Sequence, residues 1–349
     1  MRWKLMMTIL SGLGLLLLVL AGFSFFSFKM PKGSVAMGGM ADAAVATFLV
    51  EAIHKYISGD LFGISFLADV GSISGGMGGV ASAIAVPIAM GANPVLAIVA
   101  GVACGGCGIL PGFIAGYIVG FIIPIIEKKL PEGLNLIVGT LLIAPLARFI
   151  ALGATPLVDA TLVQIGGTIS AAAEQSPLVM GFLLGGIMKM ICTSPLSSMA
   201  LTAMLGLKGL AMGIAAIACF GGSFTNGFIF HGLKLGDKSN VIAVMLEPLT
   251  QAPLVTSNPI PIFCSNFFGG GFAGMGAAAL GIINNAPGTA SPIPGLLAPF
   301  AFNDPMKVVM ALVIAAIGGS IAGFVGSKVF KNYKVVTKAD LERKAGVIA

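Results

Sequence analysis

Long apolar stretches separated by short polar segments dominate the chain. Three stretches without any charged residue are Leu5–Phe28 (24 residues), Val70–Ile126 (57 residues) and Val308–Ser327 (20 residues). Further apolar stretches cover roughly residues 133–158, 177–192, 199–230 and 240–300. An α-helix needs about 20 apolar residues to cross a bilayer. The pattern therefore predicts an all-α polytopic membrane protein with about eight to ten transmembrane helices, some of them broken.

The first apolar stretch follows the basic start MRWK, so it could be a cleaved signal peptide or a retained helix. Its apolar core is longer than a typical h-region of about 7–15 residues. The following sequence FSFFSFKMPKG offers no small-residue cleavage site. We therefore expect a retained first helix.

Glycine and proline interrupt the apolar stretches. The chain has 50 glycines among 349 residues, with runs such as FFGGGFAGMGAAALG, which is about twice the average usage. Four prolines fall within the 14 residues from Pro248 to Pro261. Each proline removes a backbone donor and disfavours helix in the residue before it. We expect Leu246–Phe263 to form a re-entrant hairpin tip or an unwound segment, and NNAPGTASPIPG (Asn284–Gly295) to form a loop.

The most informative polar residue is Glu247, because the next 56 residues, Pro248–Asn303, carry no charge. An ionisable group inside a membrane costs about 2.5–3.5 kcal/mol on insertion scales, so it normally faces a cavity and has a function. Uncharged donors and acceptors follow it, namely Gln251, Thr256, Ser257 and Asn258. This set suits a neutral polyhydroxylated ligand better than a phosphate or a carboxylate. The alternative is that Glu247 caps a helix at the membrane surface.

Two further polar positions precede Glu247. His231 either donates a hydrogen bond to a sugar hydroxyl or ends a helix at the headgroups, where a cationic side chain suits the helix C-terminus. Asn226 lies about one turn earlier and is its companion. Nearer the N-terminus, Glu51 and Lys55 form an i,i+4 pair, which predicts an amphipathic interfacial helix; a proton or ion relay is the alternative.

Composition agrees with the membrane assignment. The chain is 57% hydrophobic and 9% charged with a mean hydropathy of +1.04, whereas soluble domains carry roughly 25% charged residues. The net charge of +6 comes from basic residues in the C-terminal tail, at the N-terminus and in loops near Lys128 and Lys234. By the positive-inside rule, we expect these regions to face the cytoplasm. We divide the chain into one transmembrane domain, residues 1–330, and a basic cytoplasmic tail, residues 331–349.

Several function classes have no support in the sequence. Cys104 and Cys107 form a CxxC, but no second CxxC or histidine pair accompanies it, so we expect no metal site. Neither a P-loop nor a Rossmann fingerprint is present. We expect no cofactor and no nucleic-acid partner, and no catalytic residue is evident.

Two segments resemble a known family. GILPGFIAGYIVGFIIPIIEKKLPEGLNLIVGTLLIAPL resembles a segment of the membrane (IIC) subunits of the bacterial phosphoenolpyruvate-dependent sugar phosphotransferase system. LEPLTQAPLVTSNPIPI is similar to the NEP…NP stretch of those subunits, whose glutamate binds the sugar. The likeness extends over roughly residues 70–330 and is closest to stand-alone IIC-like proteins, which include a PfoR-type branch.

This resemblance implies a dimeric, elevator-type carrier with two re-entrant hairpins, in the bacterial cytoplasmic (inner) membrane. It would place Glu247 in the sugar pocket with Asn258 nearby. Leu246 stands where the family usually has asparagine, and the family's pocket histidine lies far upstream of its glutamate, so His231 does not match it. The phosphorylatable residues of IIA and IIB domains are absent, so phosphoryl transfer would belong to separate IIA and IIB proteins.

Three functions remain open from the sequence. The first is a sugar permease subunit of a phosphotransferase system. The second is a secondary transporter for a sugar or small organic acid, driven by H⁺ or Na⁺. The third is a membrane sensor that regulates another system.

Overall fold

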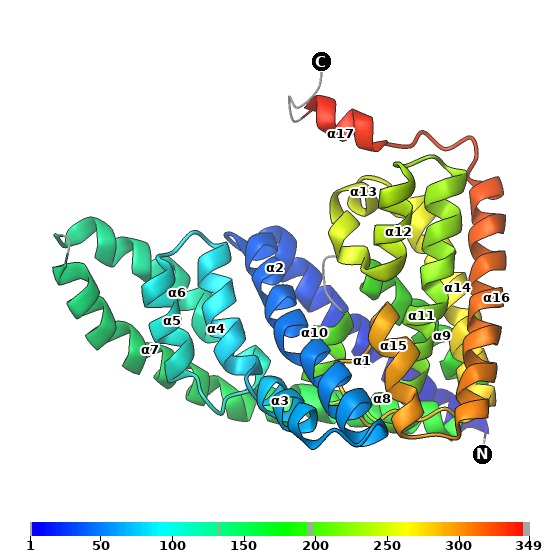
Figure 1. The fold of residues 1–349 in the computed structure, drawn as a ribbon, viewed down its shortest axis with the longest axis horizontal. Coiled ribbons are helices and arrows are strands. Elements are labelled where there is room, and N and C mark those ends of the chain that lie inside the picture. Colours follow the sequence, from blue (N-terminus) through cyan, green and yellow to red (C-terminus); the bar gives the residue numbers. More distant parts are fainter. Residues whose placement is uncertain (1, 132, 195–197, 345–349) are drawn as a thin grey trace. The chain divides into compact units, whose positions relative to one another are not determined.

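The computed structural model describes residues 2–131, 133–194 and 198–344, and these residues form helices joined by short connections (Figure 1). The α-helices are α1 (Arg2–Lys29), α2 (Gly33–Ala44), α3 (Ser65–Gly76), α4 (Gly78–Ala89), α5 (Pro94–Ala103), α6 (Ile109–Lys129), α7 (Leu134–Val158), α8 (Gln164–Gln175), α9 (Pro177–Thr193), α10 (Ser198–Met204), α11 (Gly209–Gly232), α12 (Lys238–Leu246), α13 (Ala252–Ser257), α14 (Pro259–Ala279), α15 (Pro292–Leu297), α16 (Pro305–Val329) and α17 (Lys338–Lys344). Three π-helical segments, η1 (Val45–Leu49), η2 (Glu51–Leu61) and η3 (Asp159–Val163), and two 3₁₀ turns, η4 (Pro248–Gln251) and η5 (Ala298–Ala301), complete the described structure.

Five helical segments of the described chain are long and apolar enough to cross a membrane. They are Gly33–Asp60, Ile109–Lys129, Leu134–Gln175, Gly209–Gly232 and Pro305–Val329. The pair α3–α4, bent by 56°, makes six if it counts as one span. The predicted all-α membrane fold is confirmed. The number of spans by this criterion is below eight to ten because it leaves out shorter apolar helices such as α9.

The contacts within the chain separate it into two compact units. Unit 1 comprises residues 1–14, 168–198 and 207–349, and unit 2 comprises residues 15–167 and 199–206. The expected division into one domain, residues 1–330, and a tail, residues 331–349, stays a prediction.

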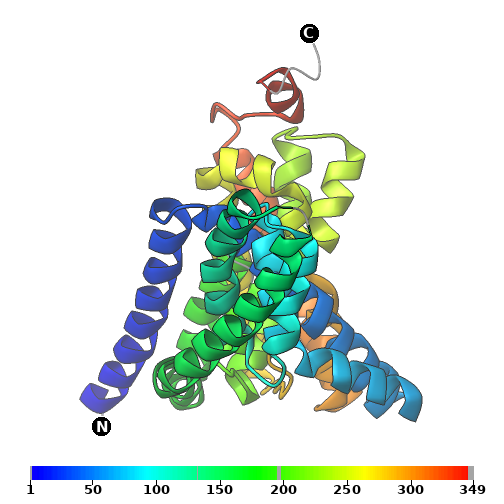
Figure 2. The ribbon, with the colours of Figure 1, turned by 90° about the vertical axis from the view of Figure 1, so that its left-hand side faces the viewer.

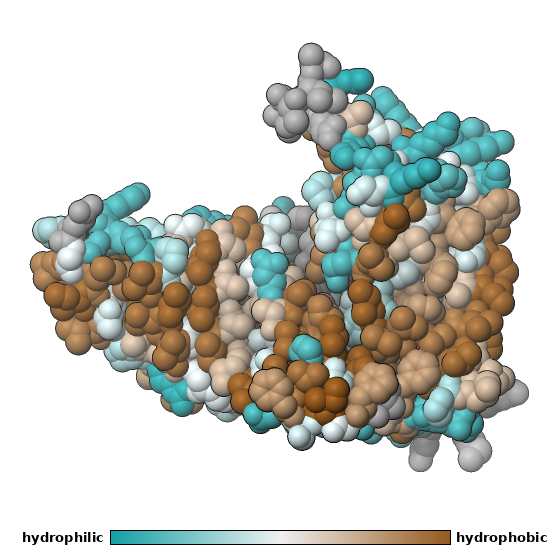
Figure 3. All heavy atoms as spheres, viewed as in Figure 1, coloured by the Kyte–Doolittle hydropathy of each residue, from teal (hydrophilic) through white to brown (hydrophobic). Residues whose placement is uncertain are grey.

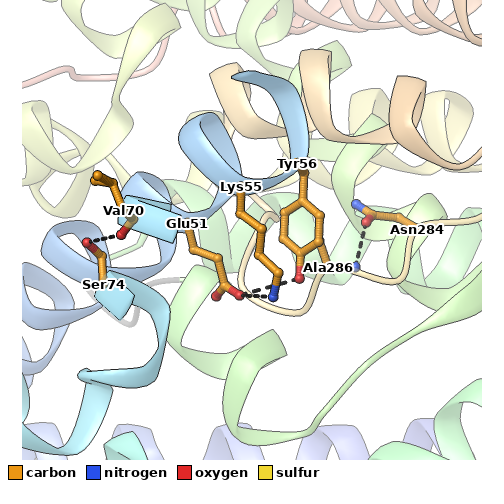
Figure 4. A network of polar contacts seen from close by, with 7 residues as sticks. All are labelled: Glu51, Lys55, Tyr56, Val70, Ser74, Asn284 and Ala286. Carbon is orange, nitrogen blue, oxygen red and sulfur yellow. Dashed lines mark hydrogen bonds and ion pairs between the residues drawn. The ribbon is translucent and has the colours of Figure 1, made fainter. Parts of the chain in front are cut away.

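In unit 2, α4, α5, α6 and α7 enclose an apolar core, which includes Leu96, Val119, Ile123 and Ile143. Figure 2 shows α6 and α7 side by side. Elsewhere in this unit the Lys55 Nζ lies 3.0 Å from the Glu51 Oε1, and both lie close to Tyr56 (Figure 4). The expected i,i+4 pair is therefore present, although it lies on a π-helical segment.

Unit 1 is built around α9, α11, α14 and α16 (Figure 1). α9 and α14 run antiparallel, since Gly181 contacts Gly274 and Gly185 contacts Gly270. A Cβ added at Gly185 would lie 2.5 Å from the Gly270 carbonyl oxygen. Glycine therefore lets the two backbones touch, which is how helices pack closely in lipid.

One end of unit 1 carries the basic segments that the sequence assigns to the cytoplasm. Lys338 in the tail forms an ion pair of 2.9 Å with Asp237, and its backbone N–H donates to the Leu235 carbonyl at 2.8 Å. The Lys338 hydrogen bond is the main cause that lowers the pKa of Asp237. Figure 3 shows polar side chains over this end and apolar side chains along α16. We call it the basic end; the positive-inside rule predicts that it faces the cytoplasm.

Candidate functional site

The first part of the site is a hairpin that enters unit 1 from the basic end. α12 begins there with a capping box between Asp237 and Asn240, and it ends before Glu247, which has extended backbone geometry. Pro248 explains this end, because proline disfavours helix in the residue before it. The chain then returns through η4 and α13 to Asn258. There the Asn258 amide bonds the backbone of Val336, which places the return at the basic end.

The depth of Glu247 follows from the length of α12. Nine residues at about 1.5 Å each span about 14 Å, close to half of a hydrocarbon core of about 30 Å. The break predicted within Leu246–Phe263 is present. Glu247 also caps η4, accepting the Leu249 N–H at 3.4 Å; in this turn Pro248 is buried and Thr250 is exposed.

A second segment enters unit 1 from the opposite end. Asn284 donates its backbone N–H to the Gly209 carbonyl at the start of α11, and its Oδ1 accepts the N–H of Ala286 (Figure 4). The chain leaves again where the Asn303 amide bonds the Ile283 backbone. The sequence predicted a loop for Asn284–Gly295, but part of this segment is the helix α15 and most of it is buried.

The two segments meet at their tips. The Ser291 hydroxyl, just before α15, donates to the Glu247 Oε2 at 3.5 Å. Both tips are helix ends, and α9 also ends nearby at Thr193, which is bonded to α14. Unwound helix ends free backbone groups for a ligand, and transporters use them at mid-membrane depth for this reason.

A polar cluster lies between α9, α11 and α14. The Asn266 Nδ2 donates to the Asn226 Oδ1 at 2.7 Å and to the Thr193 Oγ1 at 3.2 Å. The Asn226 Nδ2 donates to the Val244 carbonyl of α12 at 3.4 Å. The amides of Asn226 and Asn266 are buried, so this network joins the first hairpin to the helix bundle.

Lys189 on α9 is the most unusual residue of this region. Its side chain is 0% exposed, and among the described residues its Nζ has no hydrogen-bond partner. The side chain lies against Gly222 of α11 and Gly270 of α14, where an added Cβ would overlap it. Its charge interacts electrostatically with Glu247. A buried charge is expensive unless it is paired or meets a ligand.

Of the residues predicted to bind substrate, Glu247 and Asn226 belong to this region. Gln251 supports it, because its Oε1 accepts the Asn240 Nδ2 at 2.8 Å and thereby ties η4 to α12. Thr256 is exposed, and its hydroxyl donates to the Ala252 carbonyl at 2.8 Å within its own helix.

Asn258 and His231 lie apart from Glu247. Asn258 is buried, and its amide bonds the carbonyl of Leu254 and both backbone groups of Val336. His231 is exposed near the C-terminal end of α11, at the basic end. A substrate-binding role for these two residues stays a prediction, as it does for the other four.

Sequence reasoning missed three residues of the region, Lys189, Asn266 and Ser291. Lys189 and Thr193 share a helix face at i,i+4 spacing. Asn266 has the same spacing to Gly270, and Asn226 to Gly222. The available signal was the four-residue spacing of a polar residue and a glycine on two apolar helices, and of two polar residues on a third.

These features define a helical membrane protein whose discontinuous helices meet inside one unit, an arrangement typical of carriers. The family model described as "Phosphotransferase system, EIIC" matches residues 34–343. Because the match covers most of the chain, the protein belongs to this family of multi-pass membrane subunits. Neither the curated proteins nor the solved structures gave a match.

Proposed function

We propose that the chain is the sugar permease subunit of a phosphoenolpyruvate-dependent phosphotransferase system, as in the stand-alone PfoR-type branch that it resembles. The observation that carries this proposal is Glu247 at the tip of a re-entrant hairpin, facing Ser291 at the tip of the other. A carboxylate accepts hydrogen bonds from two sugar hydroxyls, and a nearby serine hydroxyl both donates and accepts. Membership of the EIIC family supports the same assignment.

In this proposal, the chain positions the sugar and partner proteins supply the phosphoryl chemistry. A separate IIB protein phosphorylates the sugar at the basic end, after an elevator-type movement has brought Glu247 within its reach. A IIA protein recharges IIB. The carrier works as a homodimer in the bacterial inner membrane and needs no cofactor of its own. Its contribution to the reaction is orientation and release of the sugar.

Uptake in cells tests the coupling. Cells that express the chain are given radiolabelled sugars, with and without the general phosphocarrier proteins, and intracellular sugar phosphate is measured. We expect sugar phosphate to accumulate only when the phosphocarriers are present. We also expect Glu247→Gln to abolish accumulation and Glu127→Gln, in the last turn of α6, to leave it unchanged. Sugar phosphate that is unchanged by loss of the phosphocarriers would refute the coupling.

The second candidate is an ion-coupled carrier, and one observation favours it. Lys189 and Glu247 interact electrostatically inside the membrane part, and buried ionisable residues of opposite charge are typical of proton relays. Purified protein in liposomes distinguishes the two. Sugar concentrated by an H⁺ or Na⁺ gradient alone would support this candidate against the first.

A further inference from the structure

Two buried polar atoms at the junction of α9, α11 and α14 lack partners among the described residues. They are the Lys189 Nζ, a donor, and the Asn266 Oδ1, an acceptor. Lys189 is 0% exposed and Asn266 is 1% exposed. Buried polar groups in native proteins are nearly always hydrogen-bonded, so each exception needs an explanation.

The orientation of the Asn266 amide follows from its neighbours. The Asn226 Nδ2 donates to a backbone carbonyl, that of Val244, which can only accept. The Asn226 Oδ1 is then the acceptor that faces Asn266, so the Asn266 group bonded to it is the Nδ2. The same Nδ2 bonds Thr193. The Asn266 Oδ1 is therefore the atom without a hydrogen-bond partner among the described residues. This result does not depend on how the oxygen and nitrogen of the two amides were originally assigned.

Packing alone does not account for Lys189. A methionine would fill nearly the same space between Gly222 and Gly270 without the cost of burying an ammonium group. The glycines on both sides leave room for the lysine stem and for no additional Cβ. The stem is accommodated closely, while the Nζ has no hydrogen-bond partner in the described part of the chain. This combination suits a group that binds a ligand.

We propose that Lys189 and Asn266 form a second subsite, which binds a hydroxyl group of the sugar held at Glu247. A hydroxyl both accepts and donates, so it satisfies a lysine donor and an amide acceptor together. The charges of Lys189 and Glu247 cancel, and the Asn266 oxygen repels anions. The subsite thus selects a neutral sugar or polyol over a sugar acid. This inference rests on the proposed function, and it requires the Glu247–Ser291 contact to open for the ligand to enter.

Binding and stability of purified protein in detergent test the subsite. The variants are Lys189→Met, Lys189→Gln and Glu247→Gln, with the exposed Lys307→Met as the matched control. Thermal unfolding is recorded against rising concentrations of neutral hexoses, hexitols and disaccharides, and of gluconate as the sugar acid. The sugar that stabilises the wild-type protein most is then used to measure affinity for every variant.

We expect a neutral sugar to stabilise the wild-type protein and gluconate to have no effect. Lys189→Met should weaken binding about 10- to 100-fold, the effect of losing one hydrogen bond from a charged donor. Its unfolding temperature without sugar is recorded as the control for folding, because the change also removes the opposite charge that interacts with Glu247. Lys189→Gln, which retains a donor, should bind with intermediate affinity, and Lys307→Met should bind as the wild-type protein does.

The outcomes separate this inference from the proposed function. If Lys189→Met binds sugar with wild-type affinity while Glu247→Gln does not, the second subsite is wrong and the sugar site at Glu247 stands. Lys189→Gln serves for the same comparison if Lys189→Met does not fold. Stabilisation by gluconate in place of neutral sugars overturns the charge argument. If no sugar stabilises the wild-type protein, and Glu247→Gln leaves uptake unchanged, the proposed function itself fails.

Discussion

Gly222 and Gly270 decide whether the Lys189 side chain can lie where it does. Both residues face the lysine stem from neighbouring helices, and at both a Cβ would overlap it. Glycine in a helix interior costs about 1 kcal/mol relative to alanine in helix propensity. At these two positions the cost is offset because no larger residue leaves space for a lysine between three packed helices.

Replacing Gly222 by alanine tests this close approach. The new Cβ would overlap the Cγ, Cδ and Cε atoms of Lys189, so we expect destabilisation of about 1–3 kcal/mol, as for other overpacked cores. Thermal unfolding in detergent measures it. Gly153→Ala on α7 is the matched control, because a Cβ there meets nothing within 4 Å. Lys189→Ala should restore stability to Gly222→Ala, and failure of this rescue would contradict the contact.

The amide pair of Asn226 and Asn266 provides a second test at this scale. Asn226→Ala leaves one Asn266 donor proton without its acceptor in a buried site, which should cost about 1–3 kcal/mol. Because the two side chains bond directly at 2.7 Å, the double variant with Asn266→Ala should cost less than the sum of the single variants. A coupling energy of about 0.5–3 kcal/mol is expected for residues in contact. Strictly additive effects would show that the bond contributes nothing.

At the residue scale, the sequence supports some site assignments and hides others. Glu247 and Asn226 stand out because each is a polar residue within an apolar stretch. Asn266 is separated from its partner Thr193 by 73 positions, so nothing local to either residue indicates the pair. For Lys189 the missing information is likewise spatial: only the packing of α9 against α11 and α14 brings it near Glu247.

The first hairpin and the tail form one structural element, joined by Asn258. This side chain makes three hydrogen bonds of 2.8–2.9 Å, two of them to the Val336 backbone. The tail segment also returns to the α11–α12 loop through Lys338. The hairpin is therefore held at its outer end, while the Glu247 carboxylate at its tip accepts a hydrogen bond from Ser291 of the second segment.

Replacing Asn258 by alanine should release the tail. The variant loses both bonds to Val336, so the segment between α16 and α17 should become more accessible to trypsin at Lys331 and Lys334. Limited proteolysis of the purified protein, read by mass spectrometry, measures the rate. We expect faster cleavage in Asn258→Ala than in the control Thr256→Ala, whose hydroxyl bonds only its own helix. Equal cleavage rates in the two variants would show that Asn258 does not hold the tail.

Prediction of the elements from the sequence succeeded where proline fixes the backbone. The end of α12 follows from Pro248, because proline constrains the residue before it whatever the surroundings are. The inward course of the segment around Ser291 was missed. Its small and uncharged residues fit an exposed loop and a buried turn equally well, and only the contacts with Gly209 and Glu247 distinguish them.

At the scale of the whole molecule, membrane orientation connects the hairpins to function. In unit 1 the basic end carries Lys234, Lys238, Lys328, Lys331, Lys334 and Lys338, whereas Lys208, Lys307 and the N-terminal end of α1 lie at the opposite end (Figure 1). The N-terminus and the tail therefore do not share one side, contrary to the expectation from the sequence. Cytoplasmic loops carry the excess of lysine and arginine. This rule predicts that the hairpin with Glu247 enters from the cytoplasm and the segment with Ser291 from outside. A substrate site between their tips can open alternately to either side.

Labelling of single cysteines from either side of the membrane tests this orientation. Lys331→Cys and Lys307→Cys are introduced separately into a Cys264→Ser background, because Cys264 is exposed and the other four cysteines are buried. A membrane-impermeant maleimide should label Lys307→Cys in intact cells and Lys331→Cys only in inside-out vesicles. The Cys264→Ser protein should remain unlabelled in both. The opposite labelling pattern would show that the orientation in the membrane is inverted. The Glu247 hairpin would then enter from outside, where no phosphorylated IIB protein could reach the sugar.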